Sequence, residues 1–99
     1  MTESDLVALR TYASKYIWWK TPDEAMVMPE RVVAQVMNIG DYGDVQAIAK
    51  RIGETYLRHV LQHAEVGQFS ERSWAYWHFR LGLASSIDVV PAMPTRQLE

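Results

Sequence analysis

Apolar residues recur every three or four positions through most of this chain, and this spacing predicts a series of amphipathic helices. The first helix is expected over residues 4–20, with Thr2 and Asp5 forming a capping box at its start. Four large side chains, residues 16–19, follow one another at the end of this helix. Because no single helical face can bury all four, part of this run must meet another element.

Two prolines mark the next helical segments. Thr21-Pro22 predicts a short helical turn, because threonine caps a helix and proline fits its first position. Pro29 predicts the start of a second helix, over residues 29–38. We expect Gly40 to end this helix in the left-handed conformation and Asp41 to cap the helix that follows.

Two further helices are expected within residues 44–63, on either side of Gly53. Their apolar stripes are Val45, Ile48, Ala49 and Ile52, and then Leu57, Val60, Leu61 and Ala64. We expect these two helices to form an antiparallel hairpin at the centre of the fold.

The last predicted helix, residues 70–83, carries the densest group of aromatic residues in the chain. At helical spacing it divides into two rows. Trp74, Trp77 and Leu81 are expected to be buried. The outer row is Arg72, Tyr76 and Arg80, with the guanidinium groups expected over the phenol ring.

The outer row has two interpretations. It is either an ordinary exposed face or part of a surface that binds a partner, because Arg, Tyr and Trp dominate binding hot spots. On the second interpretation the earlier tryptophans extend this surface, and the partner-binding residues are Trp18, Trp19, Arg72, Tyr76 and Arg80.

Residues 84–99 lose the helical spacing and contain Pro91 and Pro94, so they are expected to form an extended or flexible tail. The Pro-x-x-Pro spacing is also found in polyproline ligands, but the little proline around it favours an ordinary tail. The predicted fold is therefore all-α: a compact bundle of about five short helices in one domain, residues 1–83, followed by the tail.

The bulk composition is that of a folded globular domain, with 99 residues, 48% apolar residues and 22% charged residues. The chain has no cysteine, which excludes disulfides and thiolate chemistry. An acidic start and the lack of a long apolar run predict a cytoplasmic protein without a membrane span. A net charge of −2 without a basic block makes nucleic-acid binding an unfavoured interpretation.

His59 and His63, four residues apart, are the best candidates for metal ligands or catalysis. A zinc site requires at least a third protein ligand, and no neighbouring residue supplies one. The acidic residues fall at predicted helix starts, where capping explains them. We therefore expect no metal, no cofactor and no enzymatic activity, with His59 and His63 on a solvated face.

A DNA-binding regulator is the alternative function. It would use the helix pair at residues 44–63, with Lys50, Arg51 and Arg58 contacting phosphates. The second helix departs from a helix-turn-helix, because Glu54, His59 and Gln62 are polar where core residues are required.

Four stretches of the chain resemble a family of small bacterial helical proteins that are encoded beside a nucleotidyltransferase-like toxin of the abortive-infection type. The stretches are Tyr16-Ile17-Trp18-Trp19, Pro29-Glu30-Arg31-Val32-Val33-Ala34-Gln35-Val36-Met37-Asn38-Ile39-Gly40, Asp44-Val45-Gln46-Ala47 and Phe69-Ser70-Glu71-Arg72-Ser73-Trp74-Ala75-Tyr76-Trp77. The resemblance spans about residues 16–83.

The resemblance implies an antitoxin, a noncatalytic protein that binds and neutralises the toxin encoded next to it. It assigns no catalytic or binding residue. A homodimer is a further expectation from the composition, because small helical domains often cover excess aromatic surface with a second copy.

Overall fold

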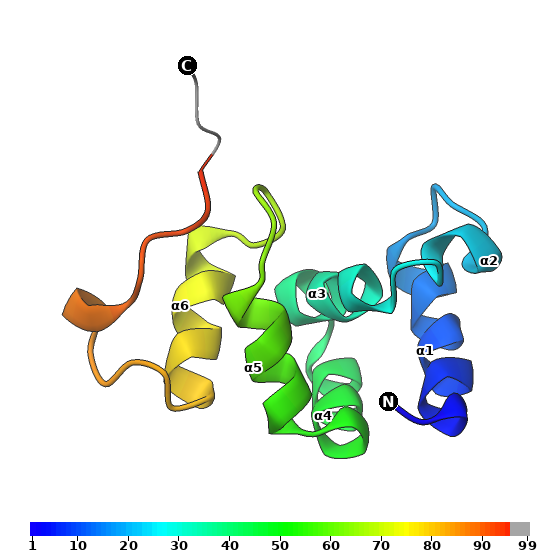
Figure 1. Ribbon diagram of the computed structural model, residues 1–99, viewed down its shortest axis with the longest axis horizontal. Helices are drawn as coiled ribbons and strands as arrows, with labels where there is room; N and C mark the ends of the chain where they lie inside the picture. Colours follow the sequence, from blue (N-terminus) through cyan, green and yellow to red (C-terminus); the bar gives the residue numbers. More distant parts are fainter. Residues whose placement is uncertain (96–99) are drawn as a thin grey trace.

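The computed structural model describes residues 1–95, and every regular element in this range is helical. The predicted all-α class is therefore confirmed (Figure 1). The elements are α1 (Glu3–Tyr16), α2 (Pro22–Ala25), α3 (Pro29–Ile39), α4 (Tyr42–Ile52), α5 (Glu54–Gln62), α6 (Glu71–Arg80) and a 3-10 turn, η1 (Ile87–Val89).

The helix starts follow the predicted caps. Thr2 and Asp5 form the expected capping box, with side-chain to backbone distances of 3.1 Å in both directions. Thr21 caps α2, and Asp41 caps α4 by accepting from the backbone N–H of Asp44 at 2.9 Å. These caps need only residues three apart in the chain, which explains why the sequence reveals them. The end of α1 was predicted less well, since the helix stops at Tyr16 and not at residue 20.

Gly40 ends α3, but the predicted left-handed conformation is wrong. Its φ and ψ are −63° and 147°, which any residue can adopt. Glycine is suited to this position for a different reason: a Cβ atom here would lie 2.4 Å from the carbonyl oxygen of Val36. A positive φ, 92°, is found instead at Gly53, between α4 and α5.

The helix α3 lies at the centre of the fold and packs against each of the other five α-helices. Figure 1 shows α1 and α2 on one side of it and α5 and α6 on the other. Five of its residues are buried, which are Val32, Val33, Ala34, Val36 and Met37. A helix apolar over so much of its circumference needs neighbours on several sides, and this arrangement supplies them.

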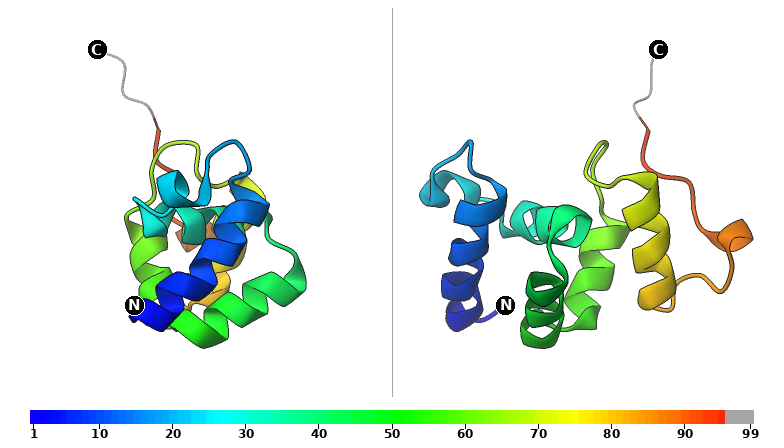
Figure 2. Two further views of the ribbon diagram at one scale, coloured as in Figure 1. Left: turned by 90° about the vertical axis from the view of Figure 1, so that its right-hand side faces the viewer. Right: turned by 180° about the vertical axis from the view of Figure 1, so that it is seen from behind.

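The helix pair predicted within residues 44–63 is present as α4 and α5, joined by Gly53 alone. One residue is too short a connection to turn two helices alongside each other. The left view of Figure 2 accordingly shows α4 lying obliquely across the end of α5. The pair forms a corner, in place of the expected antiparallel hairpin.

The aromatic helix α6 buries the predicted row. Trp77 is 1% exposed, and its indole N–H donates to the carbonyl oxygen of Met37 on α3 at 2.8 Å. Trp74 and Leu81 are also buried. The indole therefore supplies both apolar area and a satisfied polar tip at the contact between α6 and α3.

The loss of helical spacing after residue 83 is reflected in the structure, since η1 is the one regular element between residues 84 and 95. This segment also packs on the domain: the carbonyl oxygen of Pro91 accepts from the indole N–H of Trp74 at 2.7 Å, and Val90 and Met93 lie against the core. The remainder of the predicted tail, residues 96–99, lies outside the described residues.

A polar cluster joins the end of α1 to the start of α4. The Tyr16 hydroxyl donates to Asp44 at 2.6 Å and accepts from the backbone N–H of Asp41 at 3.1 Å. The Lys15 ammonium lies 2.7 Å from Asp44 and 2.9 Å from Asp41. The hydrogen bonds from Lys15 and Tyr16 hold the pKa of Asp44 below its ordinary value of 3.8.

We predict that replacing Asp44 with asparagine reduces the acid sensitivity of the fold. A carboxylate with a lowered folded-state pKa stabilises the protein above its ordinary pKa, and this stability is lost as the pH falls through the folded-state value. Urea unfolding at neutral pH and at a pH below 3.8 measures the difference, which should be smaller for Asp44→Asn than for the wild type. The exposed Asp88→Asn variant is the control. Equal acid sensitivity of Asp44→Asn and the wild type would contradict this role.

Within residues 1–95, no helix has the length and apolar character needed to cross a membrane.

Candidate functional site

The structure divides the predicted partner-binding residues between two ends of the molecule. Trp18 and Trp19 lie in the loop between α1 and α2, whereas Arg72, Tyr76 and Arg80 lie on α6 at the opposite end of the view in Figure 1. The expectation that the two tryptophans extend the α6 surface is therefore wrong. The two groups of residues therefore form two separate candidate binding surfaces.

At the α6 end, one residue of the predicted row, Arg80, is engaged in contacts within the chain. The Arg80 guanidinium donates to Gln46 on α4 at 2.6 Å and to the Tyr76 hydroxyl at 3.1 Å. It lies 4.9 Å from the ring centroid of Trp77, and not over the phenol ring as predicted. Tyr76 is 48% exposed and Arg72 is exposed. Arg80 thus holds α6 against α4, whereas Arg72 and Tyr76 remain accessible.

Two of the three predicted phosphate-contacting residues also have partners within the chain. Arg51 donates to Ser4 at 2.8 Å and pairs with Asp5 at 3.2 Å, which joins α4 to the start of α1. Arg58 donates to the carbonyl oxygen of Leu81 at 3.0 Å and so caps the end of α6. Lys50 is exposed. These contacts give Arg51 and Arg58 a structural role.

His59 on α5 and His63, which follows the last residue of that helix, are exposed, as predicted, with ring centroids 4.2 Å apart. One nitrogen of the pair, Nδ1 of His63, is 2.9 Å from the carbonyl oxygen of His59. Within residues 1–95 no group of three or more His, Cys, Asp or Glu side chains is placed to hold a metal ion. Among the described residues the pair therefore has no third ligand.

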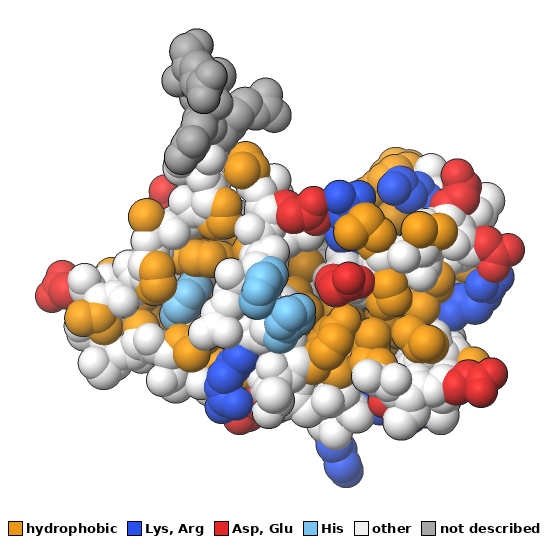
Figure 3. Space-filling view, viewed as in Figure 1, with side chains coloured by type: hydrophobic (Ala, Val, Ile, Leu, Met, Phe, Trp, Pro, Cys, Tyr) orange, Lys and Arg blue, Asp and Glu red, His pale blue; other side chains and the backbone are white. Residues whose placement is uncertain are grey.

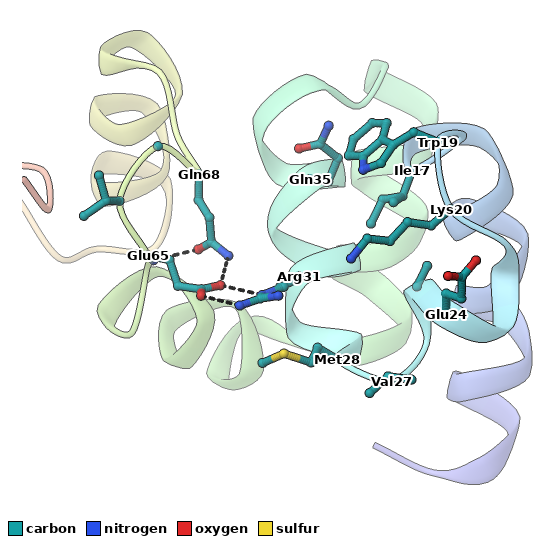
Figure 4. Close-up of a pocket in the computed structure, with 13 residues that line it drawn as sticks. Ile17, Trp19, Lys20, Glu24, Val27, Met28, Arg31, Gln35, Glu65 and Gln68 are labelled. Atoms are coloured by element: carbon teal, nitrogen blue, oxygen red, sulfur yellow. Dashed lines mark hydrogen bonds and ion pairs between the residues drawn. The ribbon is translucent and has the colours of Figure 1, made fainter. Parts of the chain in front are cut away.

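A hollow in the surface lies beside Trp19, between the α1–α2 loop, the start of α3 and the α5–α6 loop. We call it the Trp19 groove; its volume is about 380 Å³. Figure 4 shows its main side chains. The lining residues are Ile17, Trp19, Lys20, Glu24, Ala25, Val27, Met28, Arg31, Gln35, Glu65, Val66, Gly67 and Gln68.

The local sequence explains why the tryptophans face outward. Tyr16 and Ile17 are buried at the end of α1, and the backbone N–H of Lys20 then bonds to the carbonyl oxygen of Ile17 at 3.2 Å. This turn leaves Trp18 and Trp19 outside, 76% and 56% exposed. Their rings meet edge to face, with centroids 5.6 Å apart. Such a pair presents a large apolar surface in a defined geometry.

Further apolar side chains surround the groove. Val27 is 78% exposed, and Met28 and Val66 are exposed as well. Figure 3 shows apolar side chains gathered on this side of the molecule, with both basic and acidic side chains among them. A cluster of exposed apolar side chains on a small domain is typical of a binding surface.

An ion pair forms the far wall of the Trp19 groove. Arg31 at the start of α3 makes two hydrogen bonds to Glu65, at 2.8 and 2.7 Å. Gln68 donates to Glu65 at 2.8 Å and accepts from its backbone N–H at 2.9 Å. Arg31 lowers the pKa of the Glu65 carboxyl. The wall is therefore held in place by contacts within the chain.

Sequence reasoning identified Trp18 and Trp19 but missed the rest of the groove. One usable signal was Met26-Val27-Met28, three apolar residues directly after the short helical turn and before Pro29. A four-residue helix has too small a face to bury all three. The contribution of Glu65 and Gln68 had no such signal, because both come from a loop more than 30 residues away.

No protein-family model, curated protein or solved structure matches this chain. The resemblance over residues 16–83 consequently remains an expectation from the sequence.

Proposed function

We propose that this chain is a noncatalytic antitoxin that binds and neutralises a nucleotidyltransferase-type toxin, with the Trp19 groove as the contact surface. The observation that carries the proposal is the exposure of four apolar side chains that line one hollow, Trp19, Val27, Met28 and Val66, with the exposed Trp18 ring against that of Trp19. The sequence resemblance suggests the class of partner. A cytoplasmic location fits this role, because an antitoxin has to meet its toxin inside the cell.

A protein partner suits this surface better than a substrate does. Tryptophan is among the residues that most often dominate the binding energy of protein interfaces, and methionine adapts to the shape of a partner. The polar wall of the groove consists of Arg31, Glu65 and Gln68, which already satisfy one another. The groove thus offers apolar area and shape, which are the properties that protein partners use.

The DNA-binding alternative has less support. Of its three basic residues, Arg51 and Arg58 contact groups of the same chain, and the net charge of the chain is negative. Nonspecific attraction to phosphates requires a basic surface.

Co-expression with the nucleotidyltransferase encoded beside this chain tests the proposal. We expect the two proteins to co-purify and the chain to restore growth to cells that make the toxin. The double variant Trp18→Ala/Trp19→Ala should weaken the complex about 30-fold or more, as loss of about 2 kcal/mol at a binding hot spot implies. Both residues are exposed, so the variant should remain folded.

The matched control is Ile87→Ala/Val89→Ala, which also removes two exposed apolar side chains but away from the groove. It should bind like the wild type. Absence of both co-purification and protection by the wild-type chain would reject the antitoxin function. Unchanged binding by the tryptophan variant would reject the Trp19 groove as the contact surface.

A further inference from the structure

A second hollow, of about 300 Å³, lies between the end of α5, the helix α6 and the segment that follows η1. We call it the His78 hollow, and it shares no lining residue with the Trp19 groove. We propose that it binds a small neutral molecule made of an apolar ring with one N–H or O–H group, which donates a hydrogen bond to Nε2 of His78. This site is independent of the proposed antitoxin function.

The walls of the His78 hollow are apolar. The segment after η1 forms one of them: Figure 1 shows it passing the start of α6, where the Trp74 indole N–H donates to the carbonyl oxygen of Pro91 at 2.7 Å. Leu61 and Trp74, which also line the hollow, are buried. None of the described residues around it is Asp, Glu, Lys or Arg. An uncharged apolar ring therefore suits these walls.

The buried polar group of this site is His78, which is 4% exposed. Its Nδ1 lies 2.7 Å from the carbonyl oxygen of Trp74, one helical turn earlier, and the two rings have centroids 4.4 Å apart. A carbonyl oxygen can only accept, so Nδ1 carries the proton of this hydrogen bond. In neutral imidazole the other nitrogen, Nε2, is then an acceptor.

The Nε2 atom is the ring nitrogen farther from the α6 backbone. Within residues 1–95 no hydrogen bond to it is found, and no side-chain nitrogen or oxygen in this range is both fully buried and without a partner. Nε2 therefore reaches accessible space, and the hollow is the accessible space that His78 lines. An acceptor surrounded by apolar walls is satisfied best by a ligand that brings one donor.

The size of the hollow and its other polar groups set the remaining properties of the ligand. A volume of about 300 Å³ is at the lower end of the range for ligand pockets, which suits one or two rings. The Trp74 donor is already used by Pro91, so the site offers an acceptor. A metal ion is a poor occupant, because within residues 1–95 no group of three or more His, Cys, Asp or Glu is placed to hold one.

Indole and 1-methylindole are the probes that test this inference, because methylation of the nitrogen removes the donor and keeps the rings. Each is titrated into the full chain at about pH 8, where an ordinary imidazole is neutral. Indole should bind saturably and about tenfold more tightly than 1-methylindole. It should also shift the nitrogen NMR signal of Nε2 of His78. The isomer 3-methylindole, which keeps the N–H, should bind like indole.

The variant His78→Phe should bind indole and 1-methylindole equally, because phenylalanine fills the position without an acceptor. The Trp74 carbonyl keeps its helical hydrogen bond in this variant. The matched control His59→Phe makes the same change at an exposed position on α5 and should keep the difference. Ala64→Phe fills the hollow without altering His78 and should abolish saturable binding of indole, which tests the site even if His78→Phe does not fold.

Three results would overturn the inference. Equal affinities of indole and 1-methylindole for the wild type would remove the acceptor role of His78. A wild-type chain that does not bind indole saturably would have no such site. Binding that Ala64→Phe leaves at wild-type strength would place the ligand elsewhere. None of these results changes the expectation for the toxin complex, since the two sites share no lining residue.

Discussion

Replacing Trp77 with alanine should lower the free energy of unfolding by about 3–5 kcal/mol, the usual cost of removing a fully buried large aromatic side chain. Trp77 is 1% exposed, and its indole joins α6 to the carbonyl oxygen of Met37 on the central helix. The variant loses the apolar contacts, leaves a cavity and removes the hydrogen-bond donor from that carbonyl. Urea unfolding followed by circular dichroism measures the change.

The neighbouring Tyr76→Ala variant is the control for this prediction. Its ring is 48% exposed and meets the Trp77 ring edge to face, with centroids 5.3 Å apart. Losing this contact and the hydrogen bond from Arg80 should cost only about 1 kcal/mol. Equal and small losses at Trp77 and Tyr76 would show that the buried and exposed faces of α6 are assigned incorrectly.

Replacing Gly40 with alanine should destabilise the fold by about 1–3 kcal/mol, the usual range for forcing extra atoms into a packed site. The added Cβ would lie 2.4 Å from the carbonyl oxygen of Val36 and 2.9 Å from one of its methyl carbons. That oxygen accepts from the backbone N–H of Gly40 at 2.7 Å, so the contact cannot open without disturbing the end of α3. Chemical unfolding of the purified variant checks the prediction.

Gly43 supplies a matched substitution with the opposite expected sign. It lies in the first turn of α4, and the closest atom to an added Cβ is 3.6 Å away, which is an ordinary contact. Alanine forms helix more readily than glycine, so Gly43→Ala should stabilise the fold by up to about 1 kcal/mol. A Gly40→Ala variant as stable as Gly43→Ala would contradict the steric explanation for Gly40.

Much of the secondary structure could be predicted because it depends on residues close together in the chain. The caps at Thr2, Thr21, Asp41 and Ser70 each use a side chain and a backbone N–H three residues apart. The burial of Trp77 was predictable in the same way, since helical spacing separates its row from that of Tyr76.

How the helices pack against one another could not be predicted from such local signals. The corner at Gly53 and the position of α6 relative to Trp18 and Trp19 depend on how remote faces pack together. The roles of the basic residues show the same limit. Arg58 contacts Leu81, 23 residues away, and Arg51 contacts Ser4, 47 residues away. Charge and spacing alone made both arginines candidates for phosphate binding.

The amino-acid sequence by itself determined that this protein is all-α, where most of its helices start and that Trp77 belongs to the core, because helical periodicity and capping operate within one or two turns. The tertiary structure alone decided that Trp18 and Trp19 stay outside, and that Trp19 shares a groove with Lys20 and the pair Arg31–Glu65. That groove is built from three loops and helix ends far apart in the chain. Only the packing of α1, α3 and α5 around a common core brings them together.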